Sequence, residues 1–176
     1  LFDQDSQVPV SFFADMQASY EEAVLVCSAP VAAIGPRIVS QRNNKAMPFK
    51  LFSRMFKRSD RVISGSTQLF HAEFLISSGC LINLAHLAQI GPMRESYFID
   101  NIDLEWCFRA IAQGFVVVGT DRAELQHSIG VEDDSAWVKA GLIVCVCPLL
   151  RYYSFRNRMA LLRGVFPLLP ATLRGF

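Results

Sequence analysis

Short apolar runs that favour strands alternate along this chain with segments whose apolar residues recur at helical spacing. The clearest helix is predicted over Asp100–Gly114, where Leu104, Phe108 and Ile111 share one face and Gly114 marks the end. The apolar run Val116–Val118 follows it and is typical of a short buried strand. This alternation predicts an α/β fold, in which helices flank a sheet.

The other segments are interpreted in the same way. Leu1–Ser6 has the pattern of a buried strand end that breaks into polar residues, so we expect the chain to begin partway through its fold. Long polar excursions are more often functional than idle. The remaining predictions are helices over 9–22 and 80–89, strands over 24–26, 29–34 and 74–77, a turn over 35–37, and a polar and basic excursion with a hairpin or short helix over 40–68.

Composition limits the class of protein. The chain has 176 residues, which is one domain's length, and its net charge of +1 gives no argument for nucleic-acid binding. Its five cysteines are odd in number and scattered among apolar residues, which favours free thiols and a cytoplasmic location. Cys145 and Cys147 are expected to be buried and inert. The longest uncharged apolar run, Ala140–Leu150, has 11 residues and is too short to span a bilayer.

Charge divides the sequence into two parts. Residues 1–138 hold eleven basic and sixteen acidic residues, whereas residues 139–176 hold six basic residues and no acidic ones. We expect the second part to be a basic amphipathic helical segment. It either covers the sheet with its arginines in solvent, or docks peripherally on anionic lipid at the inner face of the cytoplasmic membrane.

Three polar motifs could carry chemistry, and each also has a simpler explanation. Asp3 and Asp5 follow a predicted strand end and could converge on one hard cation, or could be ordinary solvated acids. Asp100 and Asp103 open the predicted helix and could act as its caps, although apolar neighbours could instead tune Asp103 for proton abstraction. His127 follows a predicted strand and, like His71 and His86, could simply be packed or exposed.

Taken together and in this order, the motifs resemble a known family. The sequence is similar to the second half of family 2 inverting glycosyltransferases of the GT-A type, and most of all to their bacterial rhamnosyltransferase branch. The resemblance rests on the segments LFDQDS, FLISSGCLI, IGPMRESYFIDNIDLEWCFRAIAQGF, LQHSIG and YYSFRNR. It implies an incomplete Rossmann-like mixed sheet, with residues 1–138 forming the C-terminal portion of the catalytic domain and residues 139–176 the helical tail.

The resemblance also implies roles for particular residues. Asp3 and Asp5 match the paired acids that hold Mg²⁺ or Mn²⁺ on the donor's diphosphate, and His127 matches a histidine that completes the metal shell. Asp103 matches the catalytic base that deprotonates the acceptor hydroxyl. The remaining matches are to acceptor-site residues (Ser78, Gly79, Glu105 and Trp106) and to residues that support the acidic helix (Arg109 and Asp100).

The implied reaction is inverting transfer of a hexosyl group, L-rhamnosyl from dTDP-L-rhamnose, to a saccharide or lipid-linked saccharide of a cell-surface polysaccharide such as O-antigen. A bound cation would stabilise the leaving diphosphate, and a single carboxylate base suits one in-line displacement. Family members begin with βα units that bind the nucleotide, and this sequence holds no counterpart of them. We therefore expect the 176 residues alone to be inactive, and an exposed sheet edge would favour self-association.

Two other classes of function remain open from the sequence. A paired-acid cation site also serves metal-dependent nucleotidyl or phosphoryl transferases, which release different products. The chain could also be a non-catalytic, membrane-associated module.

Overall fold

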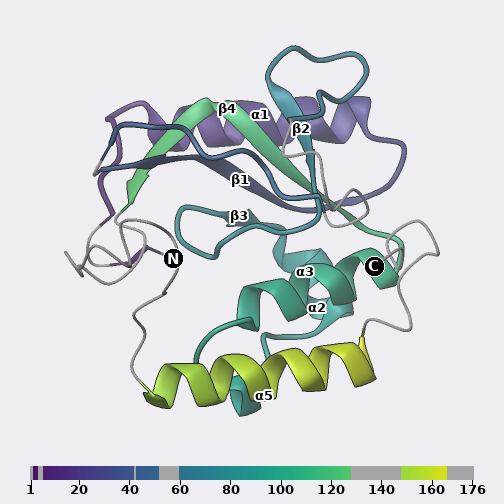
Figure 1. The fold of residues 1–176 in the computed structure, drawn as a ribbon. Helices are drawn as coiled ribbons and strands as arrows, with labels where there is room; N and C mark the ends of the chain where they lie inside the picture. The colour runs from purple at the N-terminus through teal and green to yellow at the C-terminus, as the bar shows by residue number, and fades with distance from the viewer. Residues whose placement is uncertain (1, 4–5, 42, 52–59, 128–147, 166–176) are drawn as a thin grey trace.

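The computed structural model describes residues 2–3, 6–41, 43–51, 60–127 and 148–165. Its centre is a four-stranded mixed sheet in the order β2-β4-β1-β3 (Figure 1). The strands are β1 (Val31–Ser40), β2 (Leu69–Ala72), β3 (Leu81–Ile82) and β4 (Val116–His127). Strands β1 and β4 are parallel, and the two outer strands pair with them antiparallel. The α/β fold class predicted from the alternating segments is confirmed.

Helices cover both faces of this sheet. They are α1 (Phe12–Val26), α2 (Leu84–Ile90), the 3-10 turn η2 (Glu95–Tyr97), α3 (Ile102–Ala112) and α5 (Pro148–Gly164). Helix α1 lies along one face, α2 and α3 lie on the other, and α5 packs outside α3 (Figure 1). Each interface has its own apolar cluster, centred on Phe12 and Leu125 under α1 and on Trp106 and Phe49 under α3.

Helix α1 begins and ends later than the helix predicted over 9–22. The predicted strand over 24–26 is wrong, because these residues form the last turn of the helix. Phe12, Met16, Ser19 and Ala23 recur at helical spacing and are all buried, whereas Val24 and Leu25 are exposed. Burial of this face outweighs the local preference of β-branched residues for strands.

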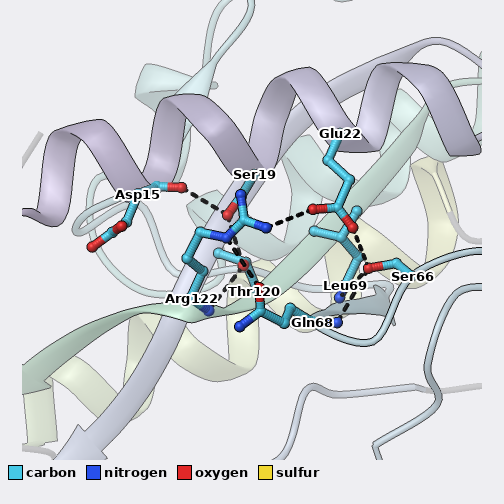
Figure 2. Close-up of polar contacts among 8 residues, drawn as sticks. All are labelled: Asp15, Ser19, Glu22, Ser66, Gln68, Leu69, Thr120 and Arg122. Atoms are coloured by element: carbon cyan, nitrogen blue, oxygen red, sulfur yellow. Dashed lines mark hydrogen bonds and ion pairs between the residues drawn. The ribbon is translucent and has the colours of Figure 1, made fainter.

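A polar network fastens α1 to the sheet (Figure 2). The buried Ser19 hydroxyl donates to the Asp15 carbonyl at 2.7 Å and lies 2.9 Å from the Thr120 hydroxyl of β4. The Arg122 guanidinium bonds both the Glu22 carboxylate of α1 and the Gln68 side chain before β2. These bonds satisfy polar groups that would be costly to bury alone, and they link α1 to β4 and to the segment before β2.

The predicted turn over 35–37 is also wrong, because β1 runs through it. Pro36 pairs with Thr120 and Arg37 pairs with Glu124, so residues 121–123 of β4 have no counterpart on β1. This irregularity explains how a central strand tolerates proline, which cannot donate a ladder hydrogen bond. As a consequence β4 is a long strand rather than the short one predicted over 116–118, and His127 is its last residue.

Two further predictions are corrected near the cleft described below. The strand predicted over 74–77 lies earlier, as β2, while Phe74 makes a single bridge to Lys50. The helix predicted over 80–89 begins at Leu84, because the Asn83 side chain accepts hydrogen bonds from the Ala85 and His86 amides. The helix predicted over 100–114 is confirmed as α3, and Gly114, at φ +88°, follows its end.

The basic tail is helical, but α5 covers α3 rather than the sheet. Leu161 and Val165 are buried against Phe108 of α3. Within the described ranges, no helix combines the length and apolar composition needed to cross a membrane. Residues 139–147, with Cys145 and Cys147, lie outside the described residues; Cys27, Cys80 and Cys107 are free thiols.

Candidate active site

The candidate site lies where the parallel strands β1 and β4 end side by side, with Ser40 paired to His127. The N-terminal segment reaches the same place because Gln7 bridges Gln126, with reciprocal backbone hydrogen bonds of 3.1 Å. The carboxyl ends of parallel strands are the usual place for ligands in open α/β sheets. The described residues of the two motifs, 2–3 and 6 of the first and 125–127 of the second, therefore lie at one edge of the sheet.

A cleft of about 310 Å³ opens at this edge. One part of its lining is polar and contains Asp3, Ser77, Asp103 and His127. The rest is mostly apolar and comes from β1, from the excursion after it and from the segment after β2: Gly35, Pro36, Ile38, Met47, Pro48, Phe49, Lys50, Phe74, Leu75, Ile76 and Cys80. An apolar cleft with a few convergent polar groups is the usual form of a small-molecule site.

Asp3 and His127 form the first polar pair. The Nε2 atom of His127 lies 3.8 Å from the Asp3 carboxylate. Asp5, the second acid of the pair predicted to hold the cation, lies outside the described residues. The described residues contain no group of three acid, histidine or cysteine side chains that could hold a metal. The Asp3 carboxylate is a ligand that suits Mg²⁺ or Mn²⁺, whereas imidazole is typical of softer transition metals.

Asp103 is the second acid of the cleft. Its carboxylate accepts a 3.0 Å hydrogen bond from the Ser77 amide, which fixes the side chain against the segment after β2. Burial raises the pKa of Asp103, the Ser77 hydrogen bond partly opposes that rise, and the nearby charge of Asp3 adds to it. Asp103 thus combines access to the cleft with an environment that makes its carboxylate more basic than an exposed one.

The capping role considered for Asp100 and Asp103 is wrong. Asn101 occupies the N-cap position of α3, and its side chain makes no capping hydrogen bond. The Asp100 carboxylate instead accepts a 2.9 Å hydrogen bond from the Asn101 amide, while Asp103 turns towards Ser77. Asp103 cannot serve as a cap because its carboxylate is engaged with a different element.

Ser78 and Gly79 connect the acidic N-terminal segment to the cleft. The Ser78 side chain is buried, and its hydroxyl accepts from the Asp3 amide at 3.1 Å and lies 2.8 Å from the Ser6 hydroxyl. Gly79 has φ +75°, and a Cβ atom there would lie 3.1 Å from Pro36 and 3.2 Å from Phe12. These contacts hold the Asp3 backbone in place, so the contribution of Ser78 and Gly79 to the site is one of positioning in this structure.

Glu105, Trp106 and Arg109 lie behind the cleft. The Glu105 side chain is 0% exposed, and its carboxylate forms ion pairs with Arg94 at 2.7 Å and with Arg109 at 2.9 Å. Trp106 is buried and donates its indole N–H to the Gly91 carbonyl at 3.0 Å. This burial does not fit the expectation that Glu105 and Trp106 contact the acceptor directly.

Arg109 links α3 to the segment around the end of α2. Besides its pair with Glu105, it donates to the carbonyls of Ile90 at 2.6 Å and Pro92 at 2.9 Å. These bonds connect α3, the helix that carries Asp103, to the end of α2 and the residues after it.

The apolar part of the cleft was missed at the level of sequence. Arg37, buried in β1, stacks over the Phe49 ring at 4.1 Å and donates to the Met47 carbonyl at 2.9 Å. It also pairs with Asp60, which accepts a hydrogen bond from the Phe49 amide. The apolar pair Pro48-Phe49 within an otherwise polar stretch was the one available signal, and nothing local pointed to Arg37.

Comparison with known proteins adds a relationship to this geometry. No protein-family model matches the chain. The chain is 29% identical over 163 residues to dTDP-rhamnosyl transferase RfbF of Shigella flexneri. The alignment covers 92% of this chain and 52% of that protein, so the chain spans about half the length of this curated relative. The chain is thus similar to part of a protein named as a dTDP-rhamnosyl transferase.

Proposed function

We propose that the complete protein is an inverting glycosyltransferase that transfers L-rhamnosyl from dTDP-L-rhamnose to a saccharide hydroxyl. The observation that carries the proposal is that Asp103 lines the same cleft as the Asp3–His127 pair, although the three residues come from distant parts of the chain. The relationship to a dTDP-rhamnosyl transferase supports the choice of donor. A saccharide of a cell-surface polysaccharide, free or lipid-linked, is the proposed acceptor.

In this mechanism Asp103 accepts the proton of the acceptor hydroxyl while that oxygen forms a bond to the anomeric carbon of the donor sugar. The bond between that carbon and the diphosphate oxygen breaks, its electron pair leaves with the nucleoside diphosphate, and the anomeric configuration inverts. Among the described residues, Asp3 and Asp103 are the carboxylates that line the cleft. With Asp3 assigned to the diphosphate side, one carboxylate is left for the base, which suits a single displacement.

Asp3, Asp5 and His127 are the residues that would hold a divalent cation. A bound Mg²⁺ or Mn²⁺ would supply Lewis-acid stabilisation of the charge that develops on the leaving diphosphate. The chain's own contribution is to fix the Asp3 segment through Ser78 and to keep His127 at the end of β4.

Product analysis with the complete protein tests the proposal. Incubation with dTDP-L-rhamnose, a saccharide acceptor and Mn²⁺ should release dTDP and give a rhamnoside of inverted anomeric configuration, both visible by NMR. Asp103→Asn should lower kcat by about 10²–10⁴-fold, which is the usual contribution of a general base. Glu95→Gln, an exposed acid of η2, is the matched control and should retain the wild-type rate.

Release of pyrophosphate or transfer of a phosphoryl group would instead support a nucleotidyl or phosphoryl transferase. A near-normal rate in Asp103→Asn would exclude Asp103 as the base.

The cation role has a test that does not depend on turnover. Mn²⁺ binding to the complete protein, followed by electron paramagnetic resonance, should weaken strongly in Asp5→Ala and in His127→Ala because each removes a proposed ligand. His71→Asn is the control, since His71 lies in β2 and does not line the cleft. Unchanged Mn²⁺ binding in both variants, together with activity in the presence of a chelator, would contradict the cation role.

A further inference from the structure

The segment that leads into α3 has an unusual backbone. Phe98 has φ 60° and ψ −59°, and the Ile99 amide donates to the Tyr97 carbonyl at 2.7 Å, which together define a strained γ-turn. Asp100 at φ 64° and Asn101 at φ 58° follow in the left-handed region. Aspartate and asparagine enter the left-handed region more readily than other non-glycine residues, so the strain lies mainly at Phe98, whose conformation is rare and has to be enforced by its surroundings. Since Asp103 comes two residues later, this segment sets the position and direction of the proposed base.

Asn157 of α5 forms hydrogen bonds with the backbone of this segment. Its side chain is buried, and its amide nitrogen donates to the carbonyls of Tyr97 at 2.9 Å, Ile99 at 2.8 Å and Asp100 at 2.8 Å. The Tyr97 carbonyl is the acceptor of the γ-turn itself. A carboxamide has two N–H donors, so one of them is shared between two of these three carbonyls, which converge from one segment.

Arg156 orients that carboxamide. The Asn157 side-chain oxygen accepts from the Arg156 Nε atom at 3.1 Å and from Nη2 at 2.8 Å. Nη2 also donates to the carbonyls of Ser96 and Tyr97. Arg156 stacks over the Tyr153 ring at 4.6 Å, and the same ring contacts Phe98.

Helix α5 and helix α3 are therefore joined at two places. Leu161 and Val165 pack on Phe108 in the middle of α3, and Asn157 holds the segment before it. The tail expected to be a cover or a membrane anchor is in contact with the element that carries the proposed base.

We propose that Asn157 is a positioning residue for glycosyl transfer, which holds the strained segment 97–101 so that Asp103 sits against Ser77 in the cleft. The inference rests on the proposed function, because it concerns the alignment of the base in that reaction. It adds to that function by making α5 a required part of the active site rather than an appendage.

Kinetics of the complete protein with a soluble acceptor test the proposal. Asn157→Ala should lower kcat by about 10²-fold, as expected when a catalytic group is misplaced by about 1 Å, while KM for the donor changes little. Arg158→Ala is the matched control, because Arg158 is the next residue of α5 and is exposed. It should leave kcat unchanged. A purely structural role for Asn157 would lower the melting temperature and leave kcat of the folded protein intact, which would overturn the proposal.

Relief of the backbone strain gives a second, independent readout. Adding Phe98→Gly to Asn157→Ala should restore kcat by about tenfold, because glycine adopts positive φ without the steric penalty. If Asn157→Ala does not fold, Arg156→Gln takes its place, since Arg156 is only partly buried and acts on the Asn157 carboxamide. Its kcat should fall in the same direction, and a wild-type kcat in Arg156→Gln would overturn the proposal.

Hydrogen exchange reports the position of Asp103 without any substrate. The Ser77 amide bonds the Asp103 carboxylate, so its exchange should accelerate in Asn157→Ala and not in Arg158→Ala. Unchanged protection of Ser77 would overturn the positioning role even if the rhamnosyl transfer is confirmed. Absence of any transferase activity in the wild-type protein would overturn the proposed function, and this inference with it.

Discussion

Asp103 is half-buried near a second carboxylate, that of Asp3, and this environment disfavours its ionised form. Burial raises the pKa of Asp103 above its ordinary value of 3.8. The folded state therefore holds the proton more tightly than the unfolded state, and the folded protein loses stability as pH rises through the range between the two pKa values. The proposed role as general base requires the ionised form, so stability and the proposed function favour opposite protonation states of Asp103.

The first prediction is that Asp103→Asn is at least as stable as the wild type at neutral pH, although its kcat is about 10²–10⁴-fold lower. Asparagine keeps an acceptor for the Ser77 amide but carries no charge. Relative to the wild type, its free energy of unfolding should increase as pH rises through the raised pKa of Asp103, and then stay constant. Urea unfolding of both proteins over a series of pH values measures this. If the difference in free energy of unfolding between the two proteins does not depend on pH, ionisation of Asp103 does not destabilise the folded wild type.

The second prediction concerns the acid side of the pH–rate profile. Because the base must be deprotonated and burial raises its pKa, kcat/KM should begin to fall on acidification at a pH above the ordinary aspartate value of 3.8. The measurement is kcat/KM across the acid range with the wild type and Glu95→Gln. A profile that stays flat down to that value would contradict the assignment of Asp103 as the base.

The third prediction concerns the close packing at Gly79. Gly79→Ala should lower the free energy of unfolding by about 2–4 kcal/mol, because it combines a positive φ with a Cβ atom crowded against Pro36 and Phe12. Gly114→Ala is the control: its φ is also positive, but a Cβ atom there would meet nothing within 4 Å. That variant should lose about 1–2 kcal/mol. Equal losses in urea unfolding would exclude crowding as a cause.

At the scale of elements, the sequence predicted those helices and strands whose bounds depend on residues within the same segment. Helix α3 was found because its apolar spacing and Gly114 act within one segment. Strand β1 was partly misread, because Pro36 normally ends a strand and its tolerance here depends on the irregular pairing with β4. The end of α1 was misread because burial of its inner face, which a sequence window does not contain, decides where it stops.

The candidate site shows the same division. Asp3, Asp103 and His127 were singled out from motif order and resemblance, and the structure places all three at one cleft. Arg37 was not singled out, and Asn157 lies in the matching segment YYSFRNR without a role predicted for it, because the contacts of both residues are with partners far away in sequence. Asn157 meets carbonyls 57 to 60 residues earlier, and backbone acceptors leave no mark on a sequence.

The fourth prediction concerns the outer face of α5. Leu149, Tyr152, Phe155 and Leu162 are exposed there, and the exposed residues Arg158 and Arg163 lie on the same helix. An apolar face next to basic side chains suits the surface of an anionic bilayer. Reversing Arg158 and Arg163 to glutamate should weaken binding to phosphatidylglycerol-containing vesicles by at least about tenfold, given about 1 kcal/mol per basic residue.

Sedimentation with these vesicles, and with neutral vesicles of phosphatidylcholine alone, measures that change. The exposed pair Lys45→Glu and Arg61→Glu, outside α5, is the charge-matched control. Charge reversal is a cleaner test than deletion of the tail, because deletion would also remove the grip of Asn157 on the segment before α3. Vesicle binding that neither the α5 reversal nor added salt alters would contradict a lipid-docking role.

At the scale of the whole molecule, the proposed site depends on the relative positions of four stacked layers. Helix α1, the sheet, the α2–α3 layer and α5 follow one another (Figure 1), and the cleft lies at one edge of the sheet. Asp3 is fixed through Ser78, Asp103 through Ser77 and the segment before α3, and that segment through α5. A change in the packing of any of these layers should therefore alter the position of the proposed base or of the proposed cation ligands.

The last prediction follows from the size of this cleft and from the share of the relative that the chain matches. A cleft of about 310 Å³ is at the small end of the range for ligand sites, whereas a nucleotide sugar adds a base and a ribose to its diphosphate and hexose. The chain also spans about half the length of the rhamnosyl transferase that it matches. Contact with the diphosphate alone leaves the base and ribose unanchored, so much of the positioning that makes transfer fast is lost.

We expect the 176 residues alone to bind dTDP-rhamnose weakly in the presence of Mn²⁺, and a chain that extends over the full length of the relative to bind it tightly. Calorimetry on both proteins makes the comparison, with dTDP as a second ligand to separate nucleotide from sugar. Tight binding of dTDP-rhamnose by the 176 residues would show that the nucleotide site is complete within them and would contradict the need for a longer chain.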